Sequence, residues 1–268
     1  MPELPEVETI KRELSPHLTG RRIAGTTVLW PGTVRGASPS QFIDSLHGRK
    51  IESVGRRGKY LVICLDDGHD LLVHLKMTGS LIVGGPSDEP GKYARVIFTL
   101  DNGATVFFRD PRKFGKMQLV ARGEVTSQLG IEPLSDDFTV EQLKELLAKR
   151  KTSVKPVLLD QNLIAGIGNM YADESLFEAG IHPLRPADSL SETEVARLHD
   201  AIRSVLQRAI ESKGASIANY FRPDGSAGWA HQTFKVAHRR GERCQCHSNI
   251  ERIVVRGRGT YFCPACQK

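Results

Sequence analysis

The chain lacks any long hydrophobic segment. No apolar run approaches the roughly 18 residues that a membrane-spanning helix requires. The N-terminus also lacks the charged-then-apolar arrangement of a secretory signal, because the acidic amphipathic stretch MPELPEVETIKREL occupies that place. Internal repeats and low-complexity segments are absent as well. We therefore expect a cytoplasmic protein rather than a membrane or exported one.

Cysteine is scarce and unevenly distributed. Of the five cysteines, Cys64 lies alone in the apolar run YLVICLDDG, which predicts an inert, buried thiol. The other four lie within the last 25 residues: Cys244, Cys246, Cys263 and Cys266. Such crowding without a secretory signal is typical of a metal site in a reducing compartment and not of a disulfide framework.

Acidic residues are outnumbered by basic ones. The 268 residues include 37 Lys and Arg against 31 Asp and Glu, which gives a net charge of +6. A basic excess of this size suits a polyanionic partner, although solvated surfaces of mixed charge produce similar totals. The length allows one large domain or two medium ones with real cores.

Residues 22–120 are predicted to be rich in β-strands. Short apolar runs such as KYLVICLDD and ARVIFTL recur there, separated by turn signals such as Asp-Asp-Gly and Asp-Asn-Gly. Six or more short strands with such turns predict a sandwich or a barrel.

A helix is predicted ahead of these strands. Pro5, followed by glutamates, is an ordinary helix start. The apolar residues behind it share one helical face: Val7, Ile10 and Leu14. Pro2 and Glu3 precede this helix, and helix initiation does not explain them.

The pattern changes after the strands. GEVTSQLGIEPLSDDF has no clear period and is a candidate linker. Helical patterns follow, with Leu143, Leu146 and Leu147 on one face. A longer helix follows Ser191, which forms a Ser-x-x-Glu capping box with Glu194. The tail from about residue 235 is again strand-like and strongly basic.

The strongest motif lies in the tail, GERCQCHSNIERIVVRGRGTYFCPACQK. Sixteen residues separate Cys246 from Cys263, close to the spacing of zinc ribbons, in which two hairpin-linked pairs supply four ligands in a tetrahedron. The first pair is C-x-C and is followed directly by His247, so Cys244 with His247 would restore a two-residue spacing. We favour the four cysteines as zinc ligands, with His247 as a possible substitute.

Arginines mark the hairpin between the two cysteine pairs. Arg252, Arg256 and Arg258 lie on it, and its tip reads Arg-Gly-Arg-Gly. A lone charge run is usually a solvated face, but a rigid, metal-pinned hairpin with arginines at its tip suits a nucleic-acid groove or its phosphates. This tail therefore predicts nucleic-acid binding.

Three further motifs carry weaker signals. GIGN at 166–169 separates two apolar segments, and a helix beginning at Asn169 would aim its N–H groups at an anion. Glycines at such corners are more often structural.

In FRDPRKFGK, basic residues alternate with Phe108 and Phe114, an arrangement that can wedge into a base stack. The alternative is a hairpin tip with one core phenylalanine. RRGKY places Lys59 at a glycine turn before a buried strand.

Several of these motifs occur in one order along the chain: PELPEVET, RRGKY, HLKMTG, DPRKFG, GIGNMYADE and CPACQK. The whole chain resembles the formamidopyrimidine-DNA glycosylases, bacterial enzymes that remove oxidised purines such as 8-oxoguanine. The related endonuclease VIII branch typically opens PEGPE, so Leu4 favours the purine-directed branch.

The resemblance implies an α+β fold: an N-terminal β-sandwich with an N-terminal helix, and a C-terminal helical domain that contains a helix–two-turn–helix and a zinc-ribbon β-hairpin. The implied domains are a catalytic sandwich, a linker, a helical DNA-binding domain and a zinc finger, at 1–121, 122–137, 138–234 and 235–268 respectively.

The resemblance also implies a DNA-formamidopyrimidine glycosylase, an N-glycosyl hydrolase, with DNA-(apurinic or apyrimidinic site) lyase activity. Removal of Met1 would free the secondary amine of Pro2, and an α-amino group, with a pKa of roughly 8, is more often neutral than lysine near pH 7. Attack at C1′ would give a Schiff-base intermediate, and β,δ-elimination would nick the abasic site. Glu3 would transfer protons, Lys59 would assist, and Glu6 would support the catalytic pocket.

The implied partner is damaged double-stranded DNA, bound by a monomer that carries one structural Zn²⁺ and acts at the bacterial nucleoid. The damaged nucleotide must leave the duplex, because C1′ is inaccessible inside the stack. The residues that match gap-filling positions are Met77, Arg112 and Phe114. Those that match phosphate contacts are His74, Lys155, Asn169 and Arg258.

The chain departs from the family pattern at a few positions. The first cysteine pair is one residue shorter than the usual C-x-x-C. Ala218 lies where many relatives carry a basic residue in the loop that covers the flipped base, and His231 and Ala237 also differ. These departures bear on lesion preference more than on the reaction. Two alternatives therefore stay open: an endonuclease VIII-like, pyrimidine-preferring glycosylase, and a non-catalytic protein that binds damaged DNA.

Overall fold

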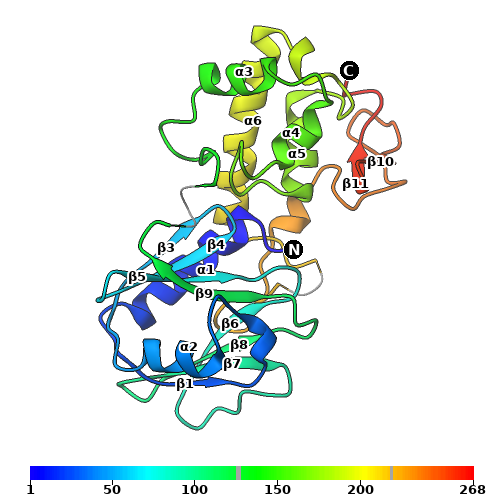
Figure 1. Ribbon diagram of the computed structural model, residues 1–268. Helices are drawn as coiled ribbons and strands as arrows, with labels where there is room; N and C mark the ends of the chain where they lie inside the picture. The colour runs from blue at the N-terminus through cyan, green and yellow to red at the C-terminus, as the bar shows by residue number, and fades with distance from the viewer. Residues whose placement is uncertain (125–127, 218–219) are drawn as a thin grey trace. The chain divides into compact units, whose positions relative to one another are not determined.

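The structure, a computed structural model, describes residues 1–124, 128–217 and 220–268 (Figure 1). The chain forms two compact units. The first combines Met1–Ser127 with Ser212–His231, and the second combines Gln128–Glu211 with Gln232–Lys268. None of the helices among the described residues is both long enough and apolar enough to cross a membrane.

Two β-sheets form the body of the first unit. One sheet has the strand order β1-β7-β8-β6, with bounds Ile23–Val28, Ala94–Leu100, Thr105–Arg109 and Ser80–Gly84. The other has the order β2-β9-β5-β4-β3, with bounds Val34–Arg35, Lys116–Ala121, His69–His74, Tyr60–Leu65 and Ile51–Arg57. Buried residues of both sheets belong to one hydrophobic core. The predicted β-sandwich is thereby confirmed.

Alternation along the strands decides which side chains enter that core. In β4, Leu61, Ile63 and Leu65 are buried in the shared core. Val62 points to the opposite face, where Cys64 packs against it. The Cys64 side chain is half-buried rather than fully buried, and this burial raises the pKa of its thiol.

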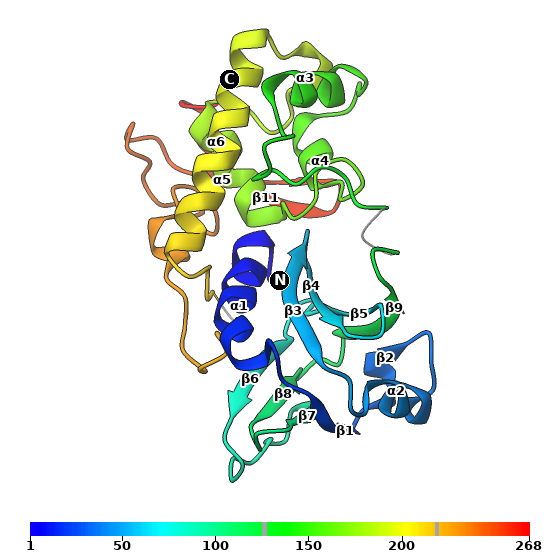
Figure 2. The ribbon, with the colours of Figure 1, turned by 90° about the vertical axis from the view of Figure 1, so that its left-hand side faces the viewer.

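The helix α1 (Leu4–Leu18) packs against β3 and β4 within the first unit (Figure 2). Its predicted apolar face is confirmed, because Val7, Ile10 and Leu14 are completely buried. A shorter helix, α2 (Pro39–Leu46), packs against β1 and starts at a capping box of Ser38 and Gln41. A single 3₁₀ turn, η1 (Pro31–Thr33), precedes β2.

The segment DPRKFG connects the two sheets. It leaves β8, which pairs with β6 and β7, and enters β9, which pairs with β5 and β2. The alternative of a hairpin tip is therefore wrong, because β8 and β9 are not partners.

Helices dominate the second unit. These are α3 (Val140–Ala148), α4 (Val154–Leu159), α5 (Asn169–Ala179) and α6 (Glu192–Glu211), with the 3₁₀ turn η3 (Ala187–Ser189). The helix α6 packs against α5 and α3, and α5 packs against α4 and β11 (Figure 1). The capping box of Ser191 and Glu194 is present, with the Ser191 N–H donating to Glu194 Oε2 at 2.8 Å.

A two-stranded hairpin, β10 (Glu251–Val255) and β11 (Arg258–Phe262), completes the second unit. The 3₁₀ turn η4 (Ala230–Thr233) lies where the chain passes from one unit to the other. The predicted linker 122–137 carries no α-helix and no strand in its described residues beyond an isolated bridge of Ile131 with Ile164. The remaining linker residues, 125–127, and Ala218 lie outside the described residues.

Candidate functional site

The N-terminus of α1 holds two of the predicted catalytic residues. Pro2 and Glu3 are both buried, and Glu3 is the N-cap of the helix. The Glu3 carboxylate accepts a hydrogen bond from the Glu6 N–H, and the Glu3 N–H donates to Glu6 Oε2 at 2.7 Å. This reciprocal capping box fixes the backbone beside Pro2. A chain terminus is usually mobile, so its burial here is informative.

Glu6 connects this helix start to a distant segment. Its side chain is only 1% exposed, and Oε1 accepts the N–H of Ala215 at 2.8 Å. Gly214 has a φ of +77°, and a Cβ at this position would lie 2.9 Å from Cγ of Glu6. Both features require glycine there. Glu6 therefore joins α1 to the segment 212–231, which the predicted domain boundaries had grouped with the helices of 138–234.

Lys59 lies at the turn between β3 and β4. Arg57 pairs with Tyr60, and Gly58 takes a φ of +55° between them. The Lys59 side chain is 7% exposed, and α1 packs against both strands of this hairpin. The glycine turn that presents Lys59 before a buried strand is confirmed.

His74 is the cross-strand partner of Tyr60, with ring centroids 4.7 Å apart. Burial, then the charges of Lys76 and Lys59, lower its pKa to about 3, so the ring is neutral at physiological pH. The Lys76 N–H donates to Nδ1 at 3.0 Å, which leaves the ring proton on Nε2. His74 is therefore a neutral donor, which is able to bind a phosphate oxygen.

A basic hollow adjoins His74. Three cationic residues help to line it: Arg35, Lys76 and Lys116. Burial and then the nearby Arg35 lower the pKa of Lys116. An anion in this hollow would relieve the repulsion among these cations. Sequence patterns did not single out Arg35 or Lys76, because the hollow forms only when β2 and β9 pair.

Met77, Arg112 and Phe114 come from two loops and meet at the surface. An Nη1 of Arg112 donates to Met77 Sδ at 3.5 Å, and its guanidinium lies 4.6 Å from the Phe114 ring centroid. Met77 and Phe114 are each 44% exposed, which is high for large apolar side chains. The structure thus brings together the three residues that were predicted to fill the gap in DNA.

Asp110 holds these two loops in place. It is 1% exposed, and its Oδ1 accepts the hydroxyl of Thr78, the residue after Met77. The same oxygen accepts the Arg112 N–H at 3.2 Å, and Oδ2 accepts the Gly115 N–H at 2.7 Å. The sequence did not single out Asp110, because an aspartate directly before a proline is an ordinary turn signal.

In the second unit, Lys155 is completely buried. Its Nζ lies 2.7 Å from Asp173 Oδ1 and donates to Thr260 Oγ1 at 2.8 Å. Burial raises the pKa of Asp173 to about 7, although the charge of Lys155 opposes this shift. The pair therefore joins α4 and α5 to β11. A phosphate contact by Lys155 stays a prediction.

Asn169 and Arg258 lie close to the same strand end. Asn169 is the first residue of α5, as predicted, and its Nδ2 donates to the Gly259 carbonyl at 2.8 Å. Lys155 Nζ approaches the same carbonyl at 3.3 Å. Arg258, directly before Gly259, is exposed. Three of the predicted phosphate contacts are thus gathered around Gly259.

Glu174 is a further buried acid that sequence analysis missed. Its carboxylate accepts the backbone N–H groups of Lys235, Val236 and Ala237, each at 2.8 Å. It therefore anchors the start of the metal-binding tail to α5. The available signal was the acidic pair Asp173 and Glu174 directly after the apolar and small residues at the start of α5.

Loss of Lys155 is expected to destabilise the protein strongly. Lys155→Met should lower the free energy of unfolding by about 3–5 kcal/mol, because a buried carboxylate is left without its counter-charge. Lys144→Met removes an exposed ion pair with Glu192 and is the matched control, which should change stability little. Urea unfolding measures both, and equal losses would contradict the assigned role of the buried pair.

The four clustered cysteines form a metal site. Their Sγ atoms all lie within 4.8 Å of one another, and two sulfur pairs lie 3.8 and 3.4 Å apart. A tetrahedral zinc with Zn–S bonds of about 2.3 Å separates its sulfurs by about 3.8 Å. The donor set therefore fits a single structural zinc. Among the described residues, this cluster comprises Cys244, Cys246, Cys263 and Cys266 without His247.

Comparison with known families agrees with this arrangement. The formamidopyrimidine-DNA glycosylase N-terminal domain matches residues 1–117, and the H2TH domain of the same enzymes matches residues 129–220. The zinc finger found in FPG and IleRS matches residues 245–268.

Solved structures are similar over the whole chain. A complex between a mutant Lactococcus lactis FPG and Fapy-dG-containing DNA has a TM-score of 0.93 and 36% identity, covering 100% of both chains. The MutM (Fpg) protein of Thermus thermophilus has a TM-score of 0.90 and 40% identity, covering 99% of this chain and 98% of that one.

Curated relatives are similar at the level of sequence. The formamidopyrimidine-DNA glycosylase of Herpetosiphon aurantiacus is 45% identical over 100% of both chains. That of Chloroflexus aurantiacus is 46% identical over 100% of this chain and 98% of its own. This chain belongs to the formamidopyrimidine-DNA glycosylase family.

Proposed function

We propose that this protein excises oxidised purines, including 8-oxoguanine and formamidopyrimidines, from duplex DNA and then nicks the abasic site. The observation that carries the proposal is the burial of Pro2 beside the capping box of Glu3 and Glu6. An indifferent N-terminus would require no such arrangement. Structures of the Lactococcus lactis relative with Fapy-dG-containing and abasic-site DNA support the substrate class.

In the proposed reaction the Pro2 nitrogen, freed by removal of Met1, bonds to C1′ of the damaged nucleotide. The N-glycosidic bond breaks, and its electron pair leaves with the base, which takes up a proton. Opening of the sugar gives a cationic iminium, which accepts electrons during elimination of the 3′ and then the 5′ phosphate. The Glu3 carboxyl is adjacent in the chain and is proposed to donate and accept these protons. Lys59 is proposed to assist.

DNA binding is proposed to use separate contacts on each unit. On the first, the neutral His74 and the basic hollow beside it would bind phosphates, while Met77, Arg112 and Phe114 would fill the gap left by the extruded nucleotide. On the second, Arg258 and the N-terminus of α5 at Asn169 would bind further phosphates. Lys155 would position them through its contact with the Gly259 carbonyl.

Borohydride trapping on a duplex containing 8-oxoguanine tests the proposal. A covalent protein–DNA adduct is expected, because borohydride reduces the iminium. Binding without an adduct would leave only a damaged-DNA-binding protein. Excision measured separately on thymine glycol duplexes distinguishes the purine-directed enzyme from a pyrimidine-preferring relative.

The gap-filling residues are expected to act on base extrusion. Arg112→Ala and Phe114→Ala should slow excision of a paired 8-oxoguanine by about ten- to a hundredfold, but cleavage of a pre-formed abasic site much less. An abasic nucleotide has no base to unstack, so the extrusion cost of a few kcal/mol largely disappears. Single-turnover rates on the two substrates measure the difference, and equal slowing would place these residues in another role.

We also propose a cytoplasmic location with activity at the nucleoid, action as a monomer, and a linker at residues 122–137. The basic charge and the family support the nucleoid assignment. Sedimentation of the free protein and of its DNA complex tests the monomer.

A further inference from the structure

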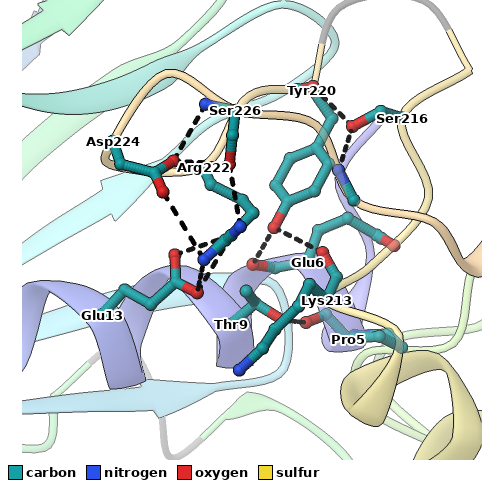
Figure 3. A network of polar contacts seen from close by, with 11 residues as sticks. Pro5, Glu6, Thr9, Glu13, Lys213, Ser216, Tyr220, Arg222, Asp224 and Ser226 are labelled. Atoms are coloured by element: carbon teal, nitrogen blue, oxygen red, sulfur yellow. Dashed lines mark hydrogen bonds and ion pairs between the residues drawn. The ribbon is translucent and has the colours of Figure 1, made fainter.

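The described residues of the segment 212–226 are bonded to α1 at more than one point (Figure 3). Near its start, Ala215 donates its N–H to Glu6. Tyr220 is 5% exposed, and its hydroxyl donates to the carbonyl of Lys213 at 3.1 Å, close to the Glu6 carbonyl. The first anchor therefore belongs to the Glu6 network already described.

A second anchor is an ion pair between Arg222 and Glu13. Nε of Arg222 lies 3.0 and 3.1 Å from the two Glu13 oxygens, and an Nη2 lies 2.7 Å from Oε1. The two side chains are only 16% and 20% exposed. A bidentate pair with this geometry is stronger and more directional than an ordinary surface ion pair.

The Arg222 guanidinium is also hydrogen-bonded within its own segment. Its Nη1 donates to the Ser226 hydroxyl at 2.8 Å, and that hydroxyl donates to Asp224 at 2.7 Å. The Gly225 N–H donates to the Arg222 carbonyl at 2.9 Å, which closes a turn. Arg222 is therefore the centre of a compact turn, and Glu13 is the group on α1 to which that turn attaches.

The attached turn forms one wall of a hollow in the first unit. Phe221 and Gly225 line it from this side, and Thr78 and Pro111 line it from the other. Thr78 follows Met77, and Pro111 precedes Arg112, so the loops that carry the gap-filling residues contribute to this hollow. The rest of its lining comes from β6, from Arg109 at the end of β8 and from Tyr93. The Val83 N–H also donates to the Pro223 carbonyl at 2.9 Å, which fixes the turn beside β6.

We propose that Glu13 and Arg222 form a positioning pair for base excision, which holds the wall of Phe221 and Gly225 against the loops of Met77 and Arg112. This inference rests on the proposed function. In this proposal the wall contacts the extruded base, whereas an abasic nucleotide has no base for it to contact. The pair therefore influences excision of the lesion base and leaves the nucleophile and the elimination steps unaffected.

The test compares Arg222→Gln and Glu13→Gln with two controls. Arg222→Lys keeps the charge and one contact, and Arg12→Gln removes an ion pair with Glu8 on the same helix. Single-turnover rates are measured on an 8-oxoguanine duplex and on a pre-formed abasic duplex. We expect the two glutamine variants to slow excision about tenfold, the size of effect typical of a lost charge-assisted hydrogen bond, with abasic cleavage changed less than about twofold.

Arg222→Lys should recover part of the excision rate, and Arg12→Gln should match the wild type on both substrates. Equal slowing on both substrates, or no slowing on either, would overturn the positioning role. A wild-type protein that excises nothing would instead reject the proposed function.

Amide hydrogen exchange tests the ion pair even if the wild-type protein excises nothing. The N–H groups of Val83, Arg222 and Gly225 are hydrogen-bonded in this turn. They should exchange at least about tenfold faster in Glu13→Gln, while the Ala215 N–H on Glu6 keeps its protection. Unchanged exchange at all four would show that the ion pair does not hold the turn.

Discussion

Blocking the N-terminus is expected to abolish both borohydride trapping and strand cleavage. Retention of Met1, or a non-cleavable tag, converts the secondary amine of Pro2 into an amide without a nucleophilic lone pair. The loss should reach the detection limit, because the buried nitrogen of Pro2 can then no longer form the iminium. DNA binding should survive, since the proposed phosphate contacts of Asn169 and Arg258 are unchanged. Intact mass confirms the block, and gel shifts measure binding.

Pro2→Gly is the matched variant for this experiment. A terminal glycine still offers a primary amine that can form an imine, so some trapping should remain, although without the fixed geometry of the proline ring. An indifferent terminus predicts the reverse pattern, in which a tag causes no loss at all. Full activity in a protein proven to be blocked would therefore remove Pro2 from the mechanism.

Local sequence patterns predicted those parts of the fold that local rules determine. The apolar face of α1, the capping box at Ser191 and the start of α5 at Asn169 each depend on residues within two helical turns, and all three are confirmed. The cysteine spacing predicted a cluster that the structure confirms, because a short hairpin brings the two pairs together.

Features that depend on distant pairing were not predictable in this way. DPRKFG connects two sheets because β8 and β9 pair with different strands. The residues of the motif itself do not indicate which strands these are. The return of Ser212–His231 to the first unit depends on single contacts, such as Glu6 with Ala215, between residues far apart in sequence. Lys155 was predicted as a phosphate contact through the resemblance, and its burial is explained by its pairing with Asp173 on another helix.

In the candidate site, too, residues within local motifs were predictable and residues with distant partners were not. Pro2, Glu3 and Lys59 were chosen through the motifs that contain them, and the structure places Pro2 and Glu3 at one capped helix start. Asp110 and Arg222 were missed because their partners, Thr78 and Glu13, are supplied by other elements. Residues that position a functional group are therefore harder to recognise from a local sequence pattern than the functional residues themselves.

Loss of zinc is the other change with a large expected effect. Cys263→Ser should remove the metal and lower DNA affinity by about a hundredfold or more, because the arginine-bearing hairpin and its charged phosphate contacts would be lost together. The reason lies in the small apolar cluster beside the metal site. Its buried members are Val236, Ile250 and two of the zinc-binding cysteines, and Phe177 and Tyr261 pack against them only partly buried.

So small an apolar cluster cannot fold a hairpin alone, and metal binding must supply much of the folding free energy. Cys64→Ser is the matched control, since Cys64 lies in the other unit on β4 and should keep both zinc and DNA binding. Metal content by mass spectrometry and DNA affinity by fluorescence anisotropy measure the two effects. A zinc stoichiometry near zero in purified wild-type protein, or undiminished DNA binding by zinc-free Cys263→Ser, would contradict a structural role for the metal in the DNA-binding hairpin.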